Sequence, residues 1–175
     1  MIPRYEQSDM TEIWTDQFKF QTYLKVEVAI LKALEKKGDV PPQTAEKVRD
    51  QAKIDVERIH EIEKTVKHDV ISFCTGVTEN LETDVAKYFH YGVTSSDIID
   101  TSLTLQIKES LDLIRPAFEE CLRELYQCAE NQKETLGLGR SHGMYAEPLS
   151  YGQKLLGHYN EFARRYEDLV RFYEN

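Results

Sequence analysis

Hydrophobic residues recur along this 175-residue chain at intervals of three and four, which is the period of an α-helix. One such run, Phe20, Leu24, Val28 and Leu31, leads to two lysines and Gly38, a combination typical of a helix C-terminus. No stretch alternates convincingly between hydrophobic and polar residues as a β-strand does. The sequence therefore predicts an all-α fold, with further helices in its first half at residues 9–14, 44–52, 55–66 and 70–81.

The second half of the chain predicts longer helices. One begins at Ser95 and continues to about Leu113. Pro116 suits the first turn of a new helical stretch and would kink a continuous helix. The last helix carries hydrophobic residues at alternating steps of four and three, which is a heptad pattern: Leu155, Tyr159, Phe162, Tyr166, Leu169 and Tyr173.

We place a domain boundary near residues 111–116. Residues 1–111 predict a compact helical N-terminal domain, and residues 112–175 predict long helices with little else in the chain to pack against. This part also carries a second hydrophobic stripe besides the heptad stripe of the last helix. We expect the two stripes to cover each other only in part; the second stripe is Phe118, Leu122, Leu125 and Ala129.

The start of the helix at Ser95 is a candidate anion site. Three hydroxyl residues, Thr94, Ser95 and Ser96, precede or begin it, and Thr94 and Asp97 have the spacing of an N-terminal cap. The first N–H groups of a helix lack intrahelical partners and carry a positive partial charge, which suits a carboxylate or phosphate. His90 lies close enough upstream to reach the same anion. The alternative is an ordinary capped helix after a glycine turn.

Two further interruptions of the helical pattern carry polar residues. Lys67-His68-Asp69 separates two predicted helices, and His142 lies among glycines in a break between the long helices. The unperturbed pKa of histidine, about 6.5, lets a histidine hold or release a proton near neutrality. His60 and His158 lie within predicted helices, and we leave them out of the candidate set.

Composition narrows the possible partners. The net charge of −9 argues against nucleic acid and against an anionic membrane surface, since both bind basic faces. No apolar run could span a bilayer, and the N-terminus lacks the form of a signal peptide. A small anionic substrate is compatible with this charge because Arg4, Lys67 and Arg140 lie within the motifs that follow.

The three cysteines are odd in number and lack metal-ligand spacing. Cys121 and Cys128 lie seven residues apart on one helical stripe, so we expect buried, small apolar residues rather than a redox pair. Free cysteines fit a reducing, cytoplasmic location.

Five short motifs follow one another along the whole chain: Ile2-Pro3-Arg4-Tyr5, Ile13-Trp14-Thr15-Asp16, Lys67-His68-Asp69-Val70, His90-Tyr91-Gly92-Val93-Thr94-Ser95-Ser96-Asp97 and Gly139-Arg140-Ser141-His142-Gly143-Met144-Tyr145-Ala146-Glu147-Pro148. In order and spacing they resemble the adenylosuccinate lyases, a family of the fumarase/aspartase superfamily. The Thr-Ser-Ser-Asp motif separates this branch from the argininosuccinate and fumarate branches.

The resemblance implies a carbon–nitrogen lyase of purine biosynthesis that uses no cofactor and no metal. Members release fumarate by β-elimination from adenylosuccinate, giving AMP, and from succinyl-aminoimidazole-carboxamide ribotide. It also implies a helical N-terminal domain, a long-helix bundle and a homotetramer. The second part of this chain, residues 112–175, would be the truncated start of that bundle.

The resemblance assigns roles to individual residues. His142 matches the proton donor, and His68 matches a residue that orients the acid or the substrate. Tyr145 stands where close relatives often have histidine, and Ser141 stands where threonine is commoner, so a secondary contact of Tyr145 is in question. The matched substrate-binding residues are Arg4, Tyr5, Lys67, His68, Asp69, His90, Thr94 and Ser95.

One family motif has no match in this chain. The catalytic base of the family is a serine on a loop with the pattern Ser-Ser-x-Met-Pro-x-Lys-x-Asn, and family members are several hundred residues long. We therefore expect an N-terminal portion of the enzyme that is inactive alone. Two alternatives are a non-catalytic helical interaction module, and another lyase of the superfamily that acts on a different succinyl or muconate substrate.

Overall fold

The computed structural model describes residues 2–174, and helices make up most of this part of the chain. The predicted helical fold is confirmed. By its internal contacts the chain forms two compact units, Met1–Ser110 and Leu111–Asn175, and each is described below by itself.

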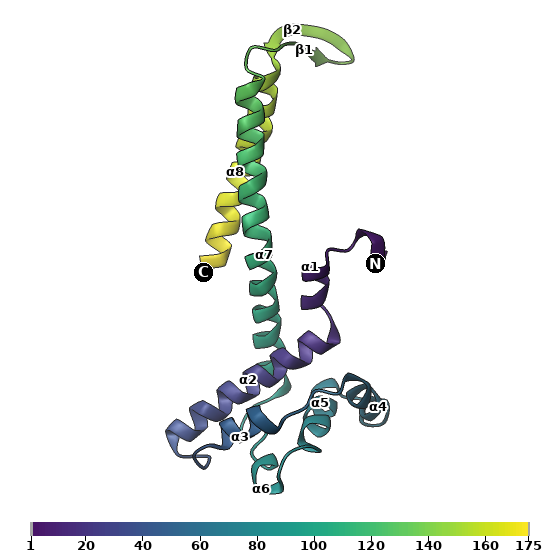
Figure 1. Cartoon of the computed structure of the whole chain (residues 1–175), viewed down its shortest axis with the longest axis vertical. Coiled ribbons are helices and arrows are strands. Elements are labelled where there is room, and N and C mark those ends of the chain that lie inside the picture. The colour runs from purple at the N-terminus through teal and green to yellow at the C-terminus, as the bar shows by residue number, and fades with distance from the viewer. Residues whose placement is uncertain (1, 175) are drawn as a thin grey trace. The chain divides into compact units, whose positions relative to one another are not determined.

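The first unit consists of short and medium helices (Figure 1). Residue types that are common at helix ends occupy the ends of these helices. The Thr15 hydroxyl accepts a hydrogen bond from the Phe18 N–H, Asp55 caps the next long helix through the Arg58 N–H, and Gly38 ends its helix in a left-handed conformation. The elements are η1 (Pro3–Tyr5), α1 (Ser8–Ile13), α2 (Asp16–Lys37), α3 (Thr44–Gln51), α4 (Val56–Val66), α5 (Asp69–Thr78), α6 (Thr83–Ala86) and the beginning of α7 (Ser95–Asn131).

Aromatic rings form the centre of the first core. Phe73 of α5 is fully buried and stacks on Phe20 of α2, with ring centroids 5.8 Å apart. Tyr23 meets the same ring edge-on at 5.4 Å, and Phe89 packs against it at 5.9 Å. Each large apolar side chain buried in this way stabilises the fold by about 1.5–3 kcal/mol. The cluster therefore joins α2, α5 and the segment before α7.

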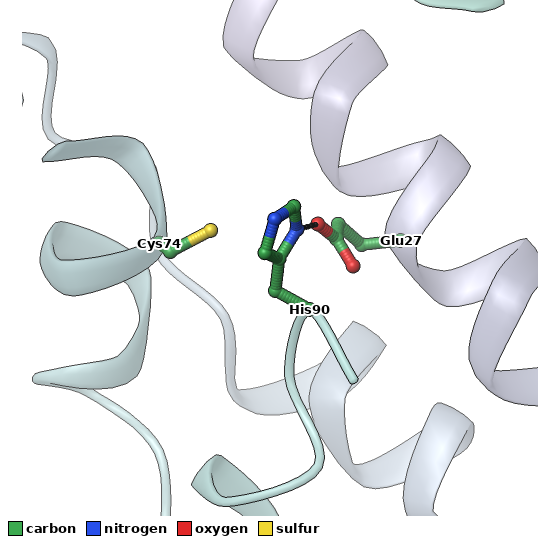
Figure 2. A group of neighbouring side chains, drawn as sticks. All are labelled: Glu27, Cys74 and His90. Carbon is green, nitrogen blue, oxygen red and sulfur yellow. Dashed lines mark hydrogen bonds and ion pairs between the residues drawn. The ribbon is translucent and has the colours of Figure 1, made fainter. Parts of the chain in front are cut away.

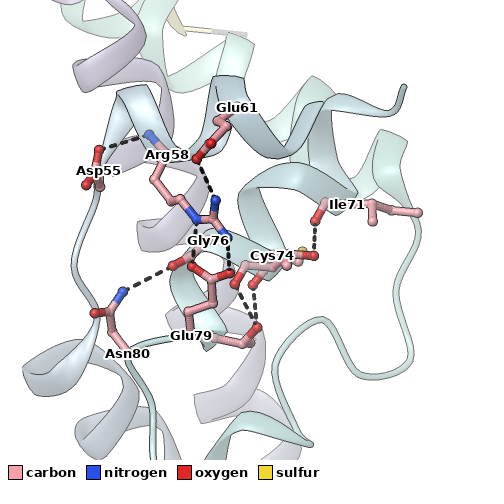
Figure 3. A network of polar contacts seen from close by, with 10 residues as sticks. Asp55, Arg58, Glu61, Ile71, Cys74, Gly76, Glu79 and Asn80 are labelled. Carbon is pink, nitrogen blue, oxygen red and sulfur yellow. Dashed lines mark hydrogen bonds and ion pairs between the residues drawn. The ribbon is translucent and has the colours of Figure 1, made fainter. Parts of the chain in front are cut away.

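A network of hydrogen bonds and ion pairs on the surface connects α4 to the C-terminal end of α5 (Figure 3). The Arg58 guanidinium donates two hydrogen bonds to the Glu79 carboxylate, at 3.0 and 2.8 Å, and a third to Glu61 at 2.5 Å. The pKa of the Glu79 carboxyl lies below its usual value because of these bonds with Arg58. This arrangement sets the direction in which α4 leads to residues 67–69.

The buried face of α7 in the first unit is mostly polar. Ser102, Gln106 and Ser110 are buried, whereas the hydrophobic residue Leu103 is 44% exposed. Gln106 donates to the Ile13 carbonyl at 2.7 Å, and the indole of Trp14 donates to Ser110 at 3.1 Å. Hydrogen bonding to α1 and to the residue after it therefore determines which face of α7 is buried here.

The second unit corrects two predictions. Pro116 lies inside the continuous helix α7, so the chain does not begin a new helix there. The break after α7 is a two-stranded antiparallel hairpin, β1 (Leu136–Ser141) and β2 (Met144–Ser150), followed by α8 (Tyr151–Glu174). The prediction that the chain has no strands was wrong. Gly137, Gly139 and Pro148 are uncommon in strands, so the sequence of this segment does not look like a strand pattern. The strands are stabilised by pairing across the turn rather than by intrinsic preference.

The two long helices of the second unit pack through aromatic residues. Phe118 of α7 lies between Phe162 and Tyr166 of α8, with ring centroids 5.6 and 5.7 Å away, and Tyr126 meets Tyr159 at 5.8 Å. The predicted partial coverage is confirmed, since most of the heptad residues are half-buried and Phe162 is 42% exposed.

The prediction that Cys121 and Cys128 are buried was wrong for both residues. Cys121 and Cys128 are exposed, and Cys74 of α5 is half-buried. The reason is that α8 covers only one side of α7, so the helix stripe with Cys121 and Cys128 stays in solvent. No helix among the described residues combines the length and hydrophobicity that crossing a bilayer would require.

Candidate functional site

Two helix N-termini meet through His68 and Ser95. His68 is the N-cap of α5, where its Nδ1 accepts a hydrogen bond from the Ile71 N–H at 3.4 Å. Its Nε2 lies 3.4 Å from the hydroxyl oxygen of Ser95, the first residue of α7. Since Nδ1 acts as acceptor, we assign the proton to Nε2, which then donates to Ser95. Both helix starts direct N–H groups and positive partial charge outward, as an anion site requires.

The backbone conformation of Lys67 and a hydrogen bond of Asp69 fix the two residues beside His68. Lys67 ends α4 in a left-handed conformation with φ of 55°, which reverses the chain toward α5. Asp69 accepts the Val70 N–H at 2.8 Å and lies 3.4 Å from the Nδ1 atom of His68. Lys67 also lines a cavity of about 320 Å³ together with His60, Glu63 and Lys64.

Thr94, rather than Ser95, occupies the N-cap position of α7. The Thr94 N–H donates to the Asp97 carboxylate at 2.8 Å, so the predicted Thr-x-x-Asp spacing acts as one half of a capping box. The Asp97 carboxylate thus accepts the Thr94 N–H, and the Ser95 hydroxyl contacts His68. The Ser95 hydroxyl can therefore accept from His68 and still donate its own hydrogen to a ligand.

His90 has a buried partner that sequence reasoning missed. Its Nδ1 lies 2.6 Å from Oε1 of Glu27, a fully buried residue of α2 (Figure 2). Burial raises the pKa of the Glu27 carboxyl, and the hydrogen bond with His90 opposes that rise. A signal was present, since Glu27 lies on the same helical face as Phe20, Leu24 and Leu31. A charged residue on a hydrophobic face is normally paired.

Glu27, Cys74 and His90 are also the candidate metal ligands in the described part of the chain, with donor atoms within 4.8 Å of one another. The distances favour a hydrogen-bonded pair over a shared ion. Two ligands on one tetrahedral zinc ion, with bonds of about 2.0–2.1 Å, lie roughly 3.3 Å apart. The Glu27–His90 separation is 2.6 Å, which is the distance of a direct hydrogen bond.

Three further predicted residues, Arg4, Tyr5 and His142, are exposed. Arg4 and Tyr5 are exposed and contact each other, with a hydrogen bond of 3.0 Å and the guanidinium 4.8 Å from the ring centroid. Within residues 2–174, neither forms a hydrogen bond or ion pair with His68 or Ser95. His142 belongs to the second unit and is exposed.

His142 and Gly143 form the two-residue turn of the hairpin. Their φ angles are 52° and 76°, and two positive values in succession are the mark of a type I′ turn. The strand pairs Ser141 with Met144 and Arg140 with Tyr145 flank the turn, and the Arg140 guanidinium lies 6.0 Å from the Tyr145 ring centroid. His142 therefore lies in a two-residue hairpin turn rather than in an irregular loop.

Residues 4–175 match the family described as Lyase, and the chain belongs to this family. Within it, the chain is 43% identical over 171 residues to the adenylosuccinate lyase of Synechocystis, covering 98% of this chain and 39% of that protein. It is 41% identical over 167 residues to the adenylosuccinate lyase of Staphylococcus saprophyticus, covering 95% of this chain and 38% of that protein. The predicted resemblance is confirmed.

Two solved enzyme structures share the fold of this chain. The 3-carboxy-cis,cis-muconate lactonizing enzyme from Pseudomonas putida superposes with a TM-score of 0.89 at 26% identity, covering 95% of this chain and 39% of that one. The fumarate lyase from Mesorhizobium sp. BNC1 gives 0.87 at 26% identity, covering 93% and 39%. The chain spans about two fifths of the length of these relatives.

Proposed function

We propose that this chain is the substrate-binding portion of an adenylosuccinate lyase, a cytoplasmic enzyme that releases fumarate from adenylosuccinate and from succinyl-aminoimidazole-carboxamide ribotide. The observation that carries the proposal is the contact of His68 with Ser95. His68 and Ser95, which are 27 positions apart in the sequence, meet at the N-termini of α5 and α7. The identity to two adenylosuccinate lyases over nearly the whole chain supports the choice of substrate.

The substrate has two carboxylates and a phosphate, so its site must supply N–H, hydroxyl and cationic groups. In this proposal, Ser95, Thr94 and the first N–H groups of α7 bind a succinyl carboxylate. His68 donates through Nε2 and orients the substrate or the acid. Lys67 and Asp69 bind beside it, His90 faces the phosphate, and Arg4 and Tyr5 contact the nucleotide.

The elimination needs a base beside a carboxylate, stabilisation of the carbanion and an acid for the departing nitrogen. We assign the acid to His142, because it matches the family's proton donor and its imidazole is exposed at the hairpin turn. The base would be the serine of the family loop, which this sequence lacks. The 175-residue chain alone should therefore be inactive, and the complete enzyme should be a homotetramer that needs no cofactor.

The test is an absorbance assay of adenylosuccinate cleavage on this chain and on a longer protein that carries the serine loop. We expect turnover only from the longer protein. In it, His142→Gln should lower kcat by about two to four decades with a smaller change in KM, because a proton donor acts mainly in the transition state. His158→Gln, an exposed histidine of α8, is the matched control and should keep full activity. Normal turnover by His142→Gln would contradict the assignment.

A further inference from the structure

One side of α4 carries three basic residues that line a common cavity. His60, Lys64 and Lys67 follow one another at steps of four and three, the spacing of residues on one face of a helix. Together with Glu63 they line a cavity of about 320 Å³. Glu63 is the one acid among these four residues, so positive charge exceeds negative charge in the cavity wall.

The two lysines of this cavity differ from the arginine of the same helix. Arg58 donates hydrogen bonds to the carboxylates of Glu79 and Glu61, which balance its charge. Within the described part of the chain, neither Lys64 nor Lys67 forms an ion pair. Their ammonium groups are therefore available to an anion that enters the cavity.

A second acid near the cavity is already neutralised. Asp16, at the start of α2, lies 3.2 Å from Nε2 of His60 and accepts a hydrogen bond from Lys19 at 2.7 Å. The bond with Lys19 holds the pKa of the Asp16 carboxyl below its usual value. Because Lys19 offsets this charge, Asp16 does little to weaken the attraction of Lys64 and Lys67 for a negative group.

The backbone of Lys67 joins the cavity to the His68–Ser95 contact. Lys67 ends α4 with a φ of 55°, a left-handed conformation in which glycine is the usual residue and a side chain carries strain. A lysine is thus kept at a position that glycine would occupy at lower cost. The next residue, His68, contacts Ser95. An anion held by Lys67 is therefore beside the proposed substrate site.

We propose that the cavity lined by His60, Lys64 and Lys67 is an encounter site, which attracts the anionic substrate before it binds at His68 and Ser95. This inference rests on the proposed function for the identity of the substrate, whereas the affinity of the cavity for a small anion does not. The chain has a net charge of −9 and repels anions in general. A local excess of positive charge offsets that repulsion and speeds association, without a part in the elimination itself.

The first experiment titrates the 175-residue chain with inorganic phosphate at low ionic strength and follows the amide signals by ¹H–¹⁵N NMR. We expect saturable shifts at residues 60–67. Lys64→Gln should weaken phosphate binding about two- to fivefold, the scale of one exposed ion pair, and Glu63→Gln should strengthen it by a similar factor. Lys36→Gln, an exposed lysine in the last turn of α2, is the matched control and should change nothing.

The opposite signs at neighbouring positions make this titration decisive. Weaker binding in both cavity variants, or no change in either, would overturn the proposal. A lowered melting temperature of Lys64→Gln with unchanged phosphate affinity would also overturn it, because the lysine would then serve only the C-terminal end of α4.

The second experiment measures adenylosuccinate cleavage by the longer protein that carries the serine loop. We expect Lys64→Gln to lower kcat/KM about two- to fivefold at low salt with kcat nearly unchanged. The difference should vanish at about 0.5 M NaCl, because salt screens exposed charges. A fall in kcat, or a loss that persists at high salt, would overturn the proposal. A longer protein without lyase activity would refute the proposed function, and the phosphate titration would still decide the role of the cavity.

Discussion

The Nε2 atom of His68 lies 3.4 Å from the hydroxyl oxygen of Ser95, and this contact joins the N-termini of α5 and α7. The start of α7 has the common Thr-x-x-Asp arrangement, whereas the start of α5 is capped by a histidine, which is not among the preferred N-cap residues. Together they bring two sets of outward N–H groups, a hydroxyl and an imidazole to one place. The predictions below follow from this contact and from three other features of the two units.

Replacing Ser95 by alanine should separate binding from capping. Because Thr94 occupies the cap position, we expect Ser95→Ala to weaken adenylosuccinate binding by about 1.5–3 kcal/mol, if the lost bond is to a carboxylate, with little loss of stability. Thr94→Ala should cost about 1 kcal/mol of stability. Calorimetric titration and thermal melting measure the two effects. An unchanged affinity with a lowered melting temperature in Ser95→Ala would make this stretch an ordinary capped helix.

Gly152 should be required where α8 meets the end of α7. Its N–H donates to the Gln132 carbonyl at 2.9 Å, and a Cβ placed there would lie 2.7 Å from the Cα of Lys133 and closer still to the Ala129 carbonyl oxygen. These are backbone atoms that cannot rotate away. We expect Gly152→Ala to destabilise the second unit by about 1–3 kcal/mol in urea unfolding.

Gly157 provides the matched control for this substitution. It lies in the same helix, and a Cβ at this position would have no atom within 4 Å. Since glycine in a helix interior is less favourable than alanine by about 0.5–1 kcal/mol, Gly157→Ala should stabilise slightly. Equal effects of the two substitutions would argue against the close approach at Gly152.

The reactivity of Cys74 should depend strongly on pH and on folding. Burial raises the pKa of its thiol to about 12, so at pH 8 roughly one molecule in ten thousand carries the reactive thiolate. Because a raised pKa disfavours the thiolate, alkylation of Cys74 should become faster as the pH rises toward 12 and on adding denaturant. Mass spectrometry of iodoacetamide-labelled peptides follows the rate. Equal labelling of Cys74 in the folded and unfolded chain at pH 8 would contradict this environment.

The second unit should self-associate. Phe172, Tyr126 and Phe162 remain largely exposed, and burying a large apolar side chain is worth about 1.5–3 kcal/mol. We expect a dimer or larger species that packs through residues 117–175 at tens of micromolar. Phe172→Glu should shift sedimentation toward the monomer with little change in folding, because this side chain is 65% exposed. A strictly monomeric wild type would refute the prediction.

Local features of the first unit were largely predictable from the sequence. Asp55 as a cap, Gly38 as a helix end and the Thr94–Asp97 spacing all act between residues within a few positions of one another. Such interactions depend on backbone geometry that the helix itself provides. The family motifs likewise named His68 and Ser95 before any contact between them was known.

The remaining features depend on groups that are distant in the sequence. Glu27 and His90 are 63 residues apart, and the periodicity of α2 says only that position 27 faces inward. The hairpin was missed because its strands gain stability from each other, across a turn with two positive φ angles. The polar buried face of α7 was missed because Ser110 and Gln106 are satisfied by Trp14 and Ile13, more than ninety residues away.

The sequence by itself thus determined the helices, their caps, the family and the candidate residues, because periodicity, capping and short motifs act over a few residues. The tertiary structure decided which candidates meet, which carboxylate holds His90 and which face of α7 is buried. Those outcomes require desolvated polar groups to find partners, and a partner can come from any part of the chain.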